Sequence, residues 1–160
     1  MANMCSNFFT ITGGNKQEIF DEMVRIANEQ QTVSDGQKAF GIGEEWMFDV
    51  VVGETNETIN FETRWSPNIS DLVEIAKLKN FQFELEAEEQ NNGVYVGYKF
   101  DGKTLFERSL EWEEIDLVEY DEENDCYLFN GEEIESEAEQ YEILLSAKPF
   151  QEVVKPQINQ

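Results

Sequence analysis

Residues 81–110 read FQFELEAEEQNNGVYVGYKFDGKTLFERSL, and this stretch decides the fold. Its first eight residues alternate apolar and polar side chains, which is the period of a strand that is buried on one face. The turn-forming residues Asn91-Asn92-Gly93 and Asp101-Gly102 then separate two further strand-like segments, 94–100 and 104–110. We therefore expect three consecutive antiparallel strands here.

A strand and a helix are expected at the start of the chain. Cys5–Thr12 is rich in β-branched and aromatic residues and stops at Gly13-Gly14, which is typical of a strand. Asn15 is a suitable helix cap, with Glu18 at the capping-box position. Apolar residues then recur at helical spacing and predict a helix of about four turns. These residues are Ile19, Phe20, Met23, Ile26 and Ala27.

A pair of strands and a second helix follow. Trp46–Val52 and Thr58–Trp65 surround a short turn, whereas residues 30–44 contain three glycines and predict a loop. Pro67 is at the start of a second amphipathic helix, whose apolar positions continue to Leu78. Alternation in the second strand places four side chains on its buried face. These are Ile59, Phe61, Thr63 and Trp65.

The predicted order of elements is therefore β α β β α β β β. Its first six elements are those of the ferredoxin-like split βαβ unit, an α+β fold, and two extra strands extend the sheet. Beyond them, Ile115–Tyr120 and Cys126–Phe129 predict strands, and Asn130-Gly131 is a strong hairpin turn. Residues 135–147 predict a helix. We expect an α+β fold with an acidic hairpin-plus-helix extension.

Charge divides the chain into parts. The 160 residues include 35 Asp and Glu against 11 Lys and Arg, which gives a net charge of −24. Residues 109–147 hold fifteen acids and no base, so we place a boundary near residue 109. We expect a ferredoxin-like domain over 1–109, an acidic hairpin and helix packed on it over 110–148, and a loose tail over 149–160.

Composition excludes several classes of function. The absence of His excludes His-dependent triads, His acid–base chemistry and His metal sites. The negative charge repels nucleic acid and anionic membranes. Cys5 and Cys126 lack the spacing of a zinc site or a disulfide framework, which favours a reducing cytosol. The most apolar run, Trp46–Val52, is too short to span a membrane. We expect a cytoplasmic, non-enzymatic protein with no catalytic residue, cofactor or resident metal.

The fifteen acids of the C-terminal part have two interpretations. They form a solvated surface that keeps an acidic protein soluble, or they mimic nucleic-acid phosphates and dock on a basic groove. If residues 133–139 are helical, acids recur about every 3 Å along the axis, close to the ~3.4 Å between phosphates of one duplex strand. Aromatic residues among them indicate that this part folds. The candidate partner-binding residues are Glu111, Glu113, Glu114, Asp116, Glu119, Asp121, Glu122, Glu123, Asp125, Glu132, Glu133, Glu135, Glu137, Glu139 and Glu142.

Two motifs carry a resemblance to a known family. The opening Met4-Cys5-Ser6-Asn7 and the segment FETRWSP at 61–67 resemble proteins with a YubB-type ferredoxin-like domain, carried by phages and plasmids. Those proteins typically begin with a Trp-Cys-Ser-Asn strand, so Met4 replaces Trp here. Their usual Trp-Gly-Thr-Lys-Trp element is not recognisable between Trp46 and Phe61. Phe81–Leu85, Glu88-Glu89 and the Gly93–Gly97 strand follow, where that family typically has an acidic turn and an aromatic-Gly strand, so the resemblance covers about residues 3–105. It implies the ferredoxin-like fold and a mobile-element origin, and no settled activity.

Three hypotheses follow for the function. The first is a phage or plasmid protein that binds and inhibits a host nucleic-acid-handling or defence protein through the acids. The partner of this protein would be a basic protein. The protein itself would bind neither nucleic acid nor a membrane. The second is a small-molecule or cation binder, with a pocket beside Trp46 and Trp65 or a cation in the Asp121–Glu132 loop, whose acids resemble calcium-loop spacing. The third is an enzyme that uses a pair of carboxylates. Cys5 is expected to be a buried small hydrophobe.

Overall fold

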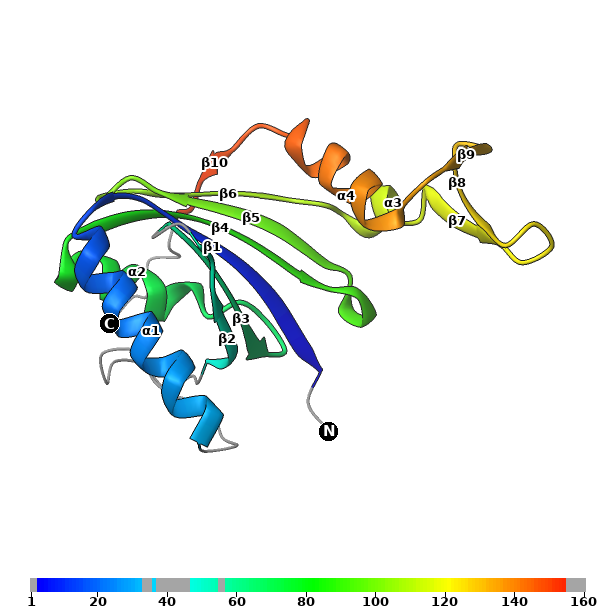
Figure 1. Ribbon diagram of the computed structural model, residues 1–160. Coiled ribbons are helices and arrows are strands. Elements are labelled where there is room, and N and C mark those ends of the chain that lie inside the picture. Colours follow the sequence, from blue (N-terminus) through cyan, green and yellow to red (C-terminus); the bar gives the residue numbers. More distant parts are fainter. Residues whose placement is uncertain (1–2, 33–35, 37–46, 55–56, 155–160) are drawn as a thin grey trace.

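The computed structural model describes residues 3–32, 36, 47–54 and 57–154, and its main feature is an antiparallel sheet of seven strands (Figure 1). Helices α1 (Lys16–Thr32) and α2 (Ile69–Lys79) cover one face of this sheet. In spatial order the strands are β10 (Gln151–Glu152), β6 (Leu105–Ser109), β5 (Val94–Phe100), β4 (Phe81–Glu89), β1 (Met4–Gly14), β3 (Thr58–Arg64) and β2 (Phe48–Val52).

The predicted α+β ferredoxin-like fold is confirmed. The elements β1, α1, β2, β3, α2 and β4 follow one another as βαββαβ, with β1 between β3 and β4, and β5 and β6 extend the sheet beyond β4 as expected. A second, three-stranded sheet and two further helices follow in the chain. The remaining elements are the 3-10 turn η2 (Gln90–Asn92), α3 (Trp112–Ile115), β7 (Val118–Asp121), β8 (Cys126–Phe129), β9 (Glu132–Ile134) and α4 (Glu137–Ser146).

The main core lies between the sheet and its two helices. Phe9 of β1 is at its centre, where its ring centroid lies 5.3 Å from that of Phe83 and 6.1 Å from that of Phe81. Both neighbours belong to the alternating stretch with which the sequence analysis began, and both are buried as predicted. The predicted helical stripe of α1 packs against these rings. Its fully buried members are Ile19, Met23 and Ile26.

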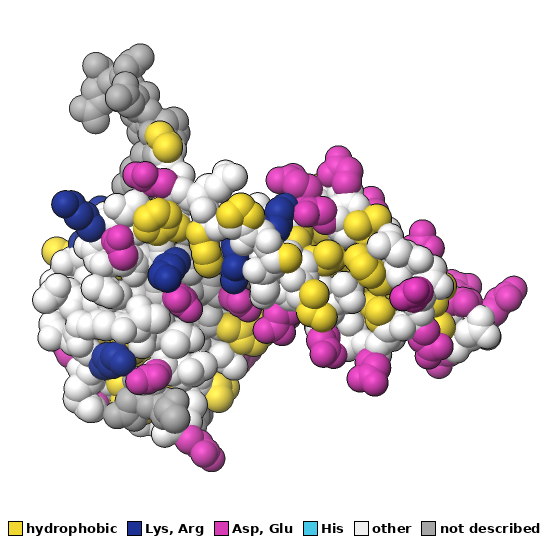
Figure 2. Space-filling model, turned by 90° about the horizontal axis from the view of Figure 1, so that it is seen from above, with side chains coloured by type: hydrophobic (Ala, Val, Ile, Leu, Met, Phe, Trp, Pro, Cys, Tyr) yellow, Lys and Arg dark blue, Asp and Glu magenta, His cyan; other side chains and the backbone are white. Residues whose placement is uncertain are grey.

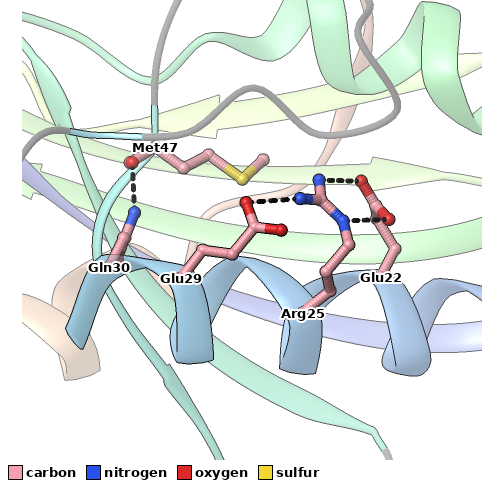
Figure 3. A network of polar contacts seen from close by, with 5 residues as sticks. All are labelled: Glu22, Arg25, Glu29, Gln30 and Met47. Atoms are coloured by element: carbon pink, nitrogen blue, oxygen red, sulfur yellow. Dashed lines mark hydrogen bonds and ion pairs between the residues drawn. The ribbon is translucent and has the colours of Figure 1, made fainter. Parts of the chain in front are cut away.

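Gln30 links the last turn of α1 to the start of β2 (Figure 3). Its Nε2 donates to the carbonyl oxygen of Met47 at 2.6 Å, and its Oε1 accepts from the backbone N–H of Val50 at 2.9 Å. These bonds hold the end of the helix, so α1 continues to Thr32 although a loop was predicted over residues 30–44. Most of that predicted loop lies outside the described residues.

One side of α1 carries a small ion-pair network (Figure 3). Arg25 donates to both carboxylate oxygens of Glu22, at 2.9 and 2.7 Å, and forms an ion pair of 2.7 Å with Glu29. The three residues lie one helical turn apart. An exposed pair of this kind contributes only about 0.3–0.5 kcal/mol. The network therefore balances charge locally on α1 more than it stabilises the fold.

The prediction that Trp65 lies on the buried face of its strand is wrong, since 54% of its surface is exposed. The other three predicted positions, Ile59, Phe61 and Thr63, are buried. β3 ends at Arg64, and Trp65 has a left-handed backbone with a φ of 68°. A positive φ turns the chain out of the strand, and this turn takes the indole away from the core.

The segment after β6 differs from the strand predicted over residues 115–120. Residues 112–115 form the single turn of α3, because Glu111 and Glu114 make a capping box in which the N–H of Glu111 donates to the Glu114 carboxylate at 2.8 Å. The strand β7 begins only at Val118. Ile115 is buried as part of this helical turn and not as part of a strand.

The start of the C-terminal tail belongs to the main sheet. Gln151 pairs with Glu107 of β6, and the guanidinium of Arg108 lies 4.2 Å from the ring centroid of Phe150. β6 is therefore flanked by a short further strand. Residues 155–160 of the predicted loose tail lie outside the described residues.

Phe8 and Phe9 provide a matched test of the register of β1. Phe9→Ala is expected to lower the free energy of unfolding by about 3–5 kcal/mol, because its ring is fully buried among other phenylalanines. Phe8→Ala is expected to cost about 1 kcal/mol, because the neighbouring side chain points to the opposite face and is 42% exposed. Urea unfolding of both variants measures the difference. Equal losses would contradict this register.

Candidate interaction surface

The fifteen candidate acids lie on one part of the molecule, which we call the acidic arm (residues 111–146). Helix α4 of the arm packs on the face of the main sheet that α1 and α2 leave open, and the small sheet β7–β9 extends beyond the C-terminal end of β6 (Figure 1). The Tyr141 and Tyr95 ring centroids lie 4.4 Å apart. A second small core, which also contains Leu110, Ile115 and Leu145, thus anchors the arm.

The small sheet β7–β9 has no fully buried side chain in any of its three strands. Tyr120 pairs with Tyr127 across β7 and β8, with ring centroids 5.2 Å apart. The predicted hairpin turn is present, since Asn130 and Gly131 have φ values of 51° and 82° and join β8 to β9. Both faces of this sheet are therefore accessible to a partner.

Twelve of the fifteen acids are exposed, and Figure 2 shows acidic side chains gathered at this end of the molecule. The other three are half-buried and hold the arm together. Glu114 forms an ion pair of 2.5 Å with Lys148, and Glu137 accepts a hydrogen bond of 3.0 Å from the Tyr141 hydroxyl. Asp121 accepts from the N–H of Glu123 at 3.0 Å. The exposed acids are Glu111, Glu113, Asp116, Glu119, Glu122, Glu123, Asp125, Glu132, Glu133, Glu135, Glu139 and Glu142.

The regular helical row of acids expected over residues 133–139 is not formed. Ser136 Oγ accepts from the N–H of Glu139 at 3.3 Å, so that α4 begins at Glu137. Glu133 belongs to β9, and Glu135 lies between strand and helix. The acids are therefore distributed over a strand, a turn and a helix, and the one-dimensional match to phosphate spacing is lost.

Exposed apolar side chains lie among the exposed acids. Trp112, Leu117, Tyr120 and Ile143 are 52%, 42%, 51% and 56% exposed. Trp112 also covers the turn at Gly93, where a Cβ would lie 2.5 Å from the indole. In the sequence, the aromatic residues of this part indicate only that it folds, because residue type alone does not reveal how exposed a side chain is. Carboxylates that surround accessible aromatic groups are typical of protein-binding surfaces.

A groove of about 430 Å³ lies where α4 meets the main sheet. Its walls include the aromatic rings of Phe8, Tyr95 and Tyr141, and we call it the outer groove. Two glutamates of β4, Glu86 and Glu88, line it together with acids of α4. From the sequence alone, these two glutamates are only the polar side of an alternating strand.

Burial shifts the pKa values of three side chains that line the groove. It raises the pKa of Glu86 and of Glu88 above the ordinary value of 4.5, and the negative charge of Glu142 raises both further. Burial and the charges of Glu137 and Glu88 raise the pKa of Tyr95 to about 12. The contributions of the neighbouring carboxylates to these pKa values agree with an acidic groove.

The sites that the other two hypotheses require are a pocket beside Trp46 and Trp65, a cation loop and an enzyme's reactive groups. Trp46 lies outside the described residues. Among the residues that the structure describes, no three or more Cys, Asp or Glu side chains gather to hold a metal ion, so the calcium-like spacing of Asp121–Glu132 brings no such group together.

Cys5 is fully buried as expected, and burial raises the pKa of its thiol to about 12, which disfavours a nucleophilic role. The described helices include none that is both long and apolar enough to cross a membrane.

Fold and surface together define an α+β protein with a ferredoxin-like domain and an acidic C-terminal arm. A family model described as the ferredoxin-like domain in Api92-like protein matches residues 31–130, which is more than half of the chain. The chain therefore belongs to this family. The matched range begins near the end of α1 and includes β7 and β8 of the arm. Neither the curated proteins nor the solved structures contain a match to the chain.

Glu88→Gln is expected to raise the free energy of unfolding by about 0.5 kcal/mol at pH 7 and to leave it unchanged near pH 4. The raised pKa of Glu88 means that the folded state binds more protons than the unfolded state above the ordinary value of 4.5. Stability is therefore lost as the pH rises through this window, and below it the neutral carboxyl resembles Gln. Urea unfolding at both pH values measures the effect. The control is Glu74→Gln, exposed on α2, and an equal gain there at pH 7 would contradict a role for burial.

Proposed function

We propose that this protein binds a basic protein through the acidic arm and acts as a non-enzymatic inhibitor of that partner. One observation supports the proposal above all. The arm combines twelve exposed acids with four large exposed hydrophobic side chains, and no Lys or Arg occurs within residues 109–147. A surface that served only for solubility would need the charges but not the apolar groups.

The proposed partner is a nucleic-acid-handling or defence protein of a host cell. Such proteins have basic grooves for the phosphate backbone, and a dense field of carboxylates is complementary to those grooves. The resemblance of Met4–Asn7 and of residues 61–67 to YubB-type proteins of phages and plasmids supports a mobile-element origin. An inhibitor of this kind would act in the cytoplasm of the host.

The proposed mechanism is occupation of the partner's groove. The carboxylates of β9, such as Glu132 and Glu133, would face the basic residues that otherwise hold phosphates. Exposed Trp112 and Tyr120 would add the desolvated contacts that dominate the binding energy of protein interfaces. Charge guides the encounter and shape gives selectivity, so the affinity should fall steeply with salt.

Capture of the partner by the tagged protein tests this proposal. We expect one basic nucleic-acid-binding protein to be retained from a bacterial lysate at about 50 mM salt, lost at about 300 mM salt, and displaced by duplex DNA. A variant with Glu119, Glu132, Glu133 and Glu135 changed to Gln should reduce retention at least about tenfold, because it removes four exposed charges from the arm. None of these four side chains carries a bond that holds the arm together in the described structure.

A control with the same change of charge separates the arm from the net charge of the protein. In this control Glu54, Glu74, Glu107 and Glu152, which are exposed outside the arm, are changed to Gln. It should retain the partner nearly as well as the unmodified protein does. Equal loss in the two variants would show that any acidic surface suffices, and undiminished retention by the arm variant would refute binding through the arm.

A further inference from the structure

Three glutamates of β4 point to the outer face of the main sheet, and each starts a row across the neighbouring strands. The pairing of β4 with β5 sets Glu84 beside Lys99, Glu86 beside Gly97, and Glu88 beside Tyr95. Successive rows therefore place a carboxylate in the same position above the sheet. What differs from row to row is the cation that faces it.

The first two rows hold their own cations. Lys99 Nζ lies 3.9 Å from Glu84. In the second row the cation comes from one strand further, since Arg108 of β6 pairs with Gly97. A Cβ on Gly97 would lie 3.4 Å from Arg108 Nε, so the absent side chain leaves room for the arginine to lie over β5 toward Glu86. The positive charge of Arg108 lowers the pKa of Glu86 against the effect of burial.

The third row contains no basic residue. Ser6, Glu88 and Tyr95 form it, and α4 adds the exposed carboxylates of Glu139 and Glu142 above them. In the described part of the chain, Glu88 has no ion-pair partner within 4.0 Å. Glu88 and Tyr95 of this row line the outer groove together with Phe8 and Tyr141.

Arg108 shows which group this surface accommodates. Its guanidinium stacks over the Phe150 ring at 4.2 Å and donates to the carbonyl oxygens of Ser146 and Lys148 at 3.3 and 3.4 Å. The hollow in which it lies shares Phe8 and Glu86 with the outer groove. Phe8 and Glu86 thus line two adjacent hollows, and the protein's own Arg108 lies in the wall of the second one.

We propose that the outer groove receives an arginine side chain of the protein partner. This inference rests on the proposed function and identifies a specific contact within it. Aromatic rings and carboxylates that line the same groove suit a guanidinium, which stacks on a ring and donates two parallel hydrogen bonds to a carboxylate. A lysine ammonium has neither the planar face nor the bidentate geometry. The volume of about 430 Å³ is ample for one such side chain.

A capped amino acid tests the groove without the partner. The probe is N-acetylarginine amide, which has a single positive charge, and N-acetylcitrulline amide is its neutral counterpart. In a nitrogen-15 NMR titration of the whole protein, we expect saturable shifts at the amides of Phe8, Glu88, Tyr95 and Tyr141 with the arginine compound only. Shifts spread evenly over all acidic residues, or equal shifts with citrulline, would overturn the inference.

Single substitutions locate the binding site. Glu88→Gln and Phe8→Leu should each weaken binding of the arginine compound about two- to fivefold, through loss of the ion pair and of the aromatic face respectively. Glu74→Gln, with the same loss of charge on α2, should leave it unchanged. If Glu74→Gln weakens binding as much as Glu88→Gln does, the compound responds only to net charge and the inference fails.

The outcomes for the groove and for the arm are separable. The fourfold arm variant changes Glu119, Glu132, Glu133 and Glu135, none of which lines the groove. If that variant loses the partner while the arginine compound does not bind in the groove, the proposed function stands and this inference is overturned. If the compound binds in the groove but the arm captures no basic protein, the proposed function is overturned.

Discussion

The antiparallel pairing of β1 with β4 is the interaction on which the rest of the structure depends. It places Phe9 beside Leu85 and Phe8 beside Glu86, so one strand pair supplies the centre of the core on one face and part of the lining of the outer groove on the other. A shift by one residue would exchange the two faces, burying the glutamates and exposing the phenylalanine cluster. Core stability and the charge pattern of the outer face are therefore fixed together.

The distribution of charge follows a similar division. On the ferredoxin-like domain several acids have basic neighbours, as in the Arg25 network of α1 and the pair of Glu84 with Lys99. On the arm, Glu114 with Lys148 is the one ion pair found among the described residues. Repulsion between the remaining carboxylates destabilises the arm, and the small core around Tyr141 opposes it. The unneutralised carboxylates lower the stability of the arm, and a role in binding a basic partner would explain why the protein has them.

The sequence predicted the features that depend on local periodicity. The alternation after Phe81 and the helical stripe from Ile19 were sufficient for the βαββαβ order. Trp65 was misplaced because the alternation of its strand gives no sign that the backbone turns left-handed there. The helical turn of α3 was missed since a capping box between two glutamates departs from the usual Ser or Thr pattern. The outer groove was beyond prediction, because it needs the register of three strands, β1, β4 and β5, together with the position of α4.

Because β7–β9 have no fully buried side chain, the small sheet has low local stability against opening. Its strands are held by backbone hydrogen bonds and half-buried rings, so the free energy needed to open it is far below that of the ferredoxin-like core. Its amide protons should exchange with solvent through local opening, while those of β1 and β4 exchange only when the whole domain unfolds. The tip of the arm is thus the least cooperative part of the molecule, a deformable element carried on a rigid base.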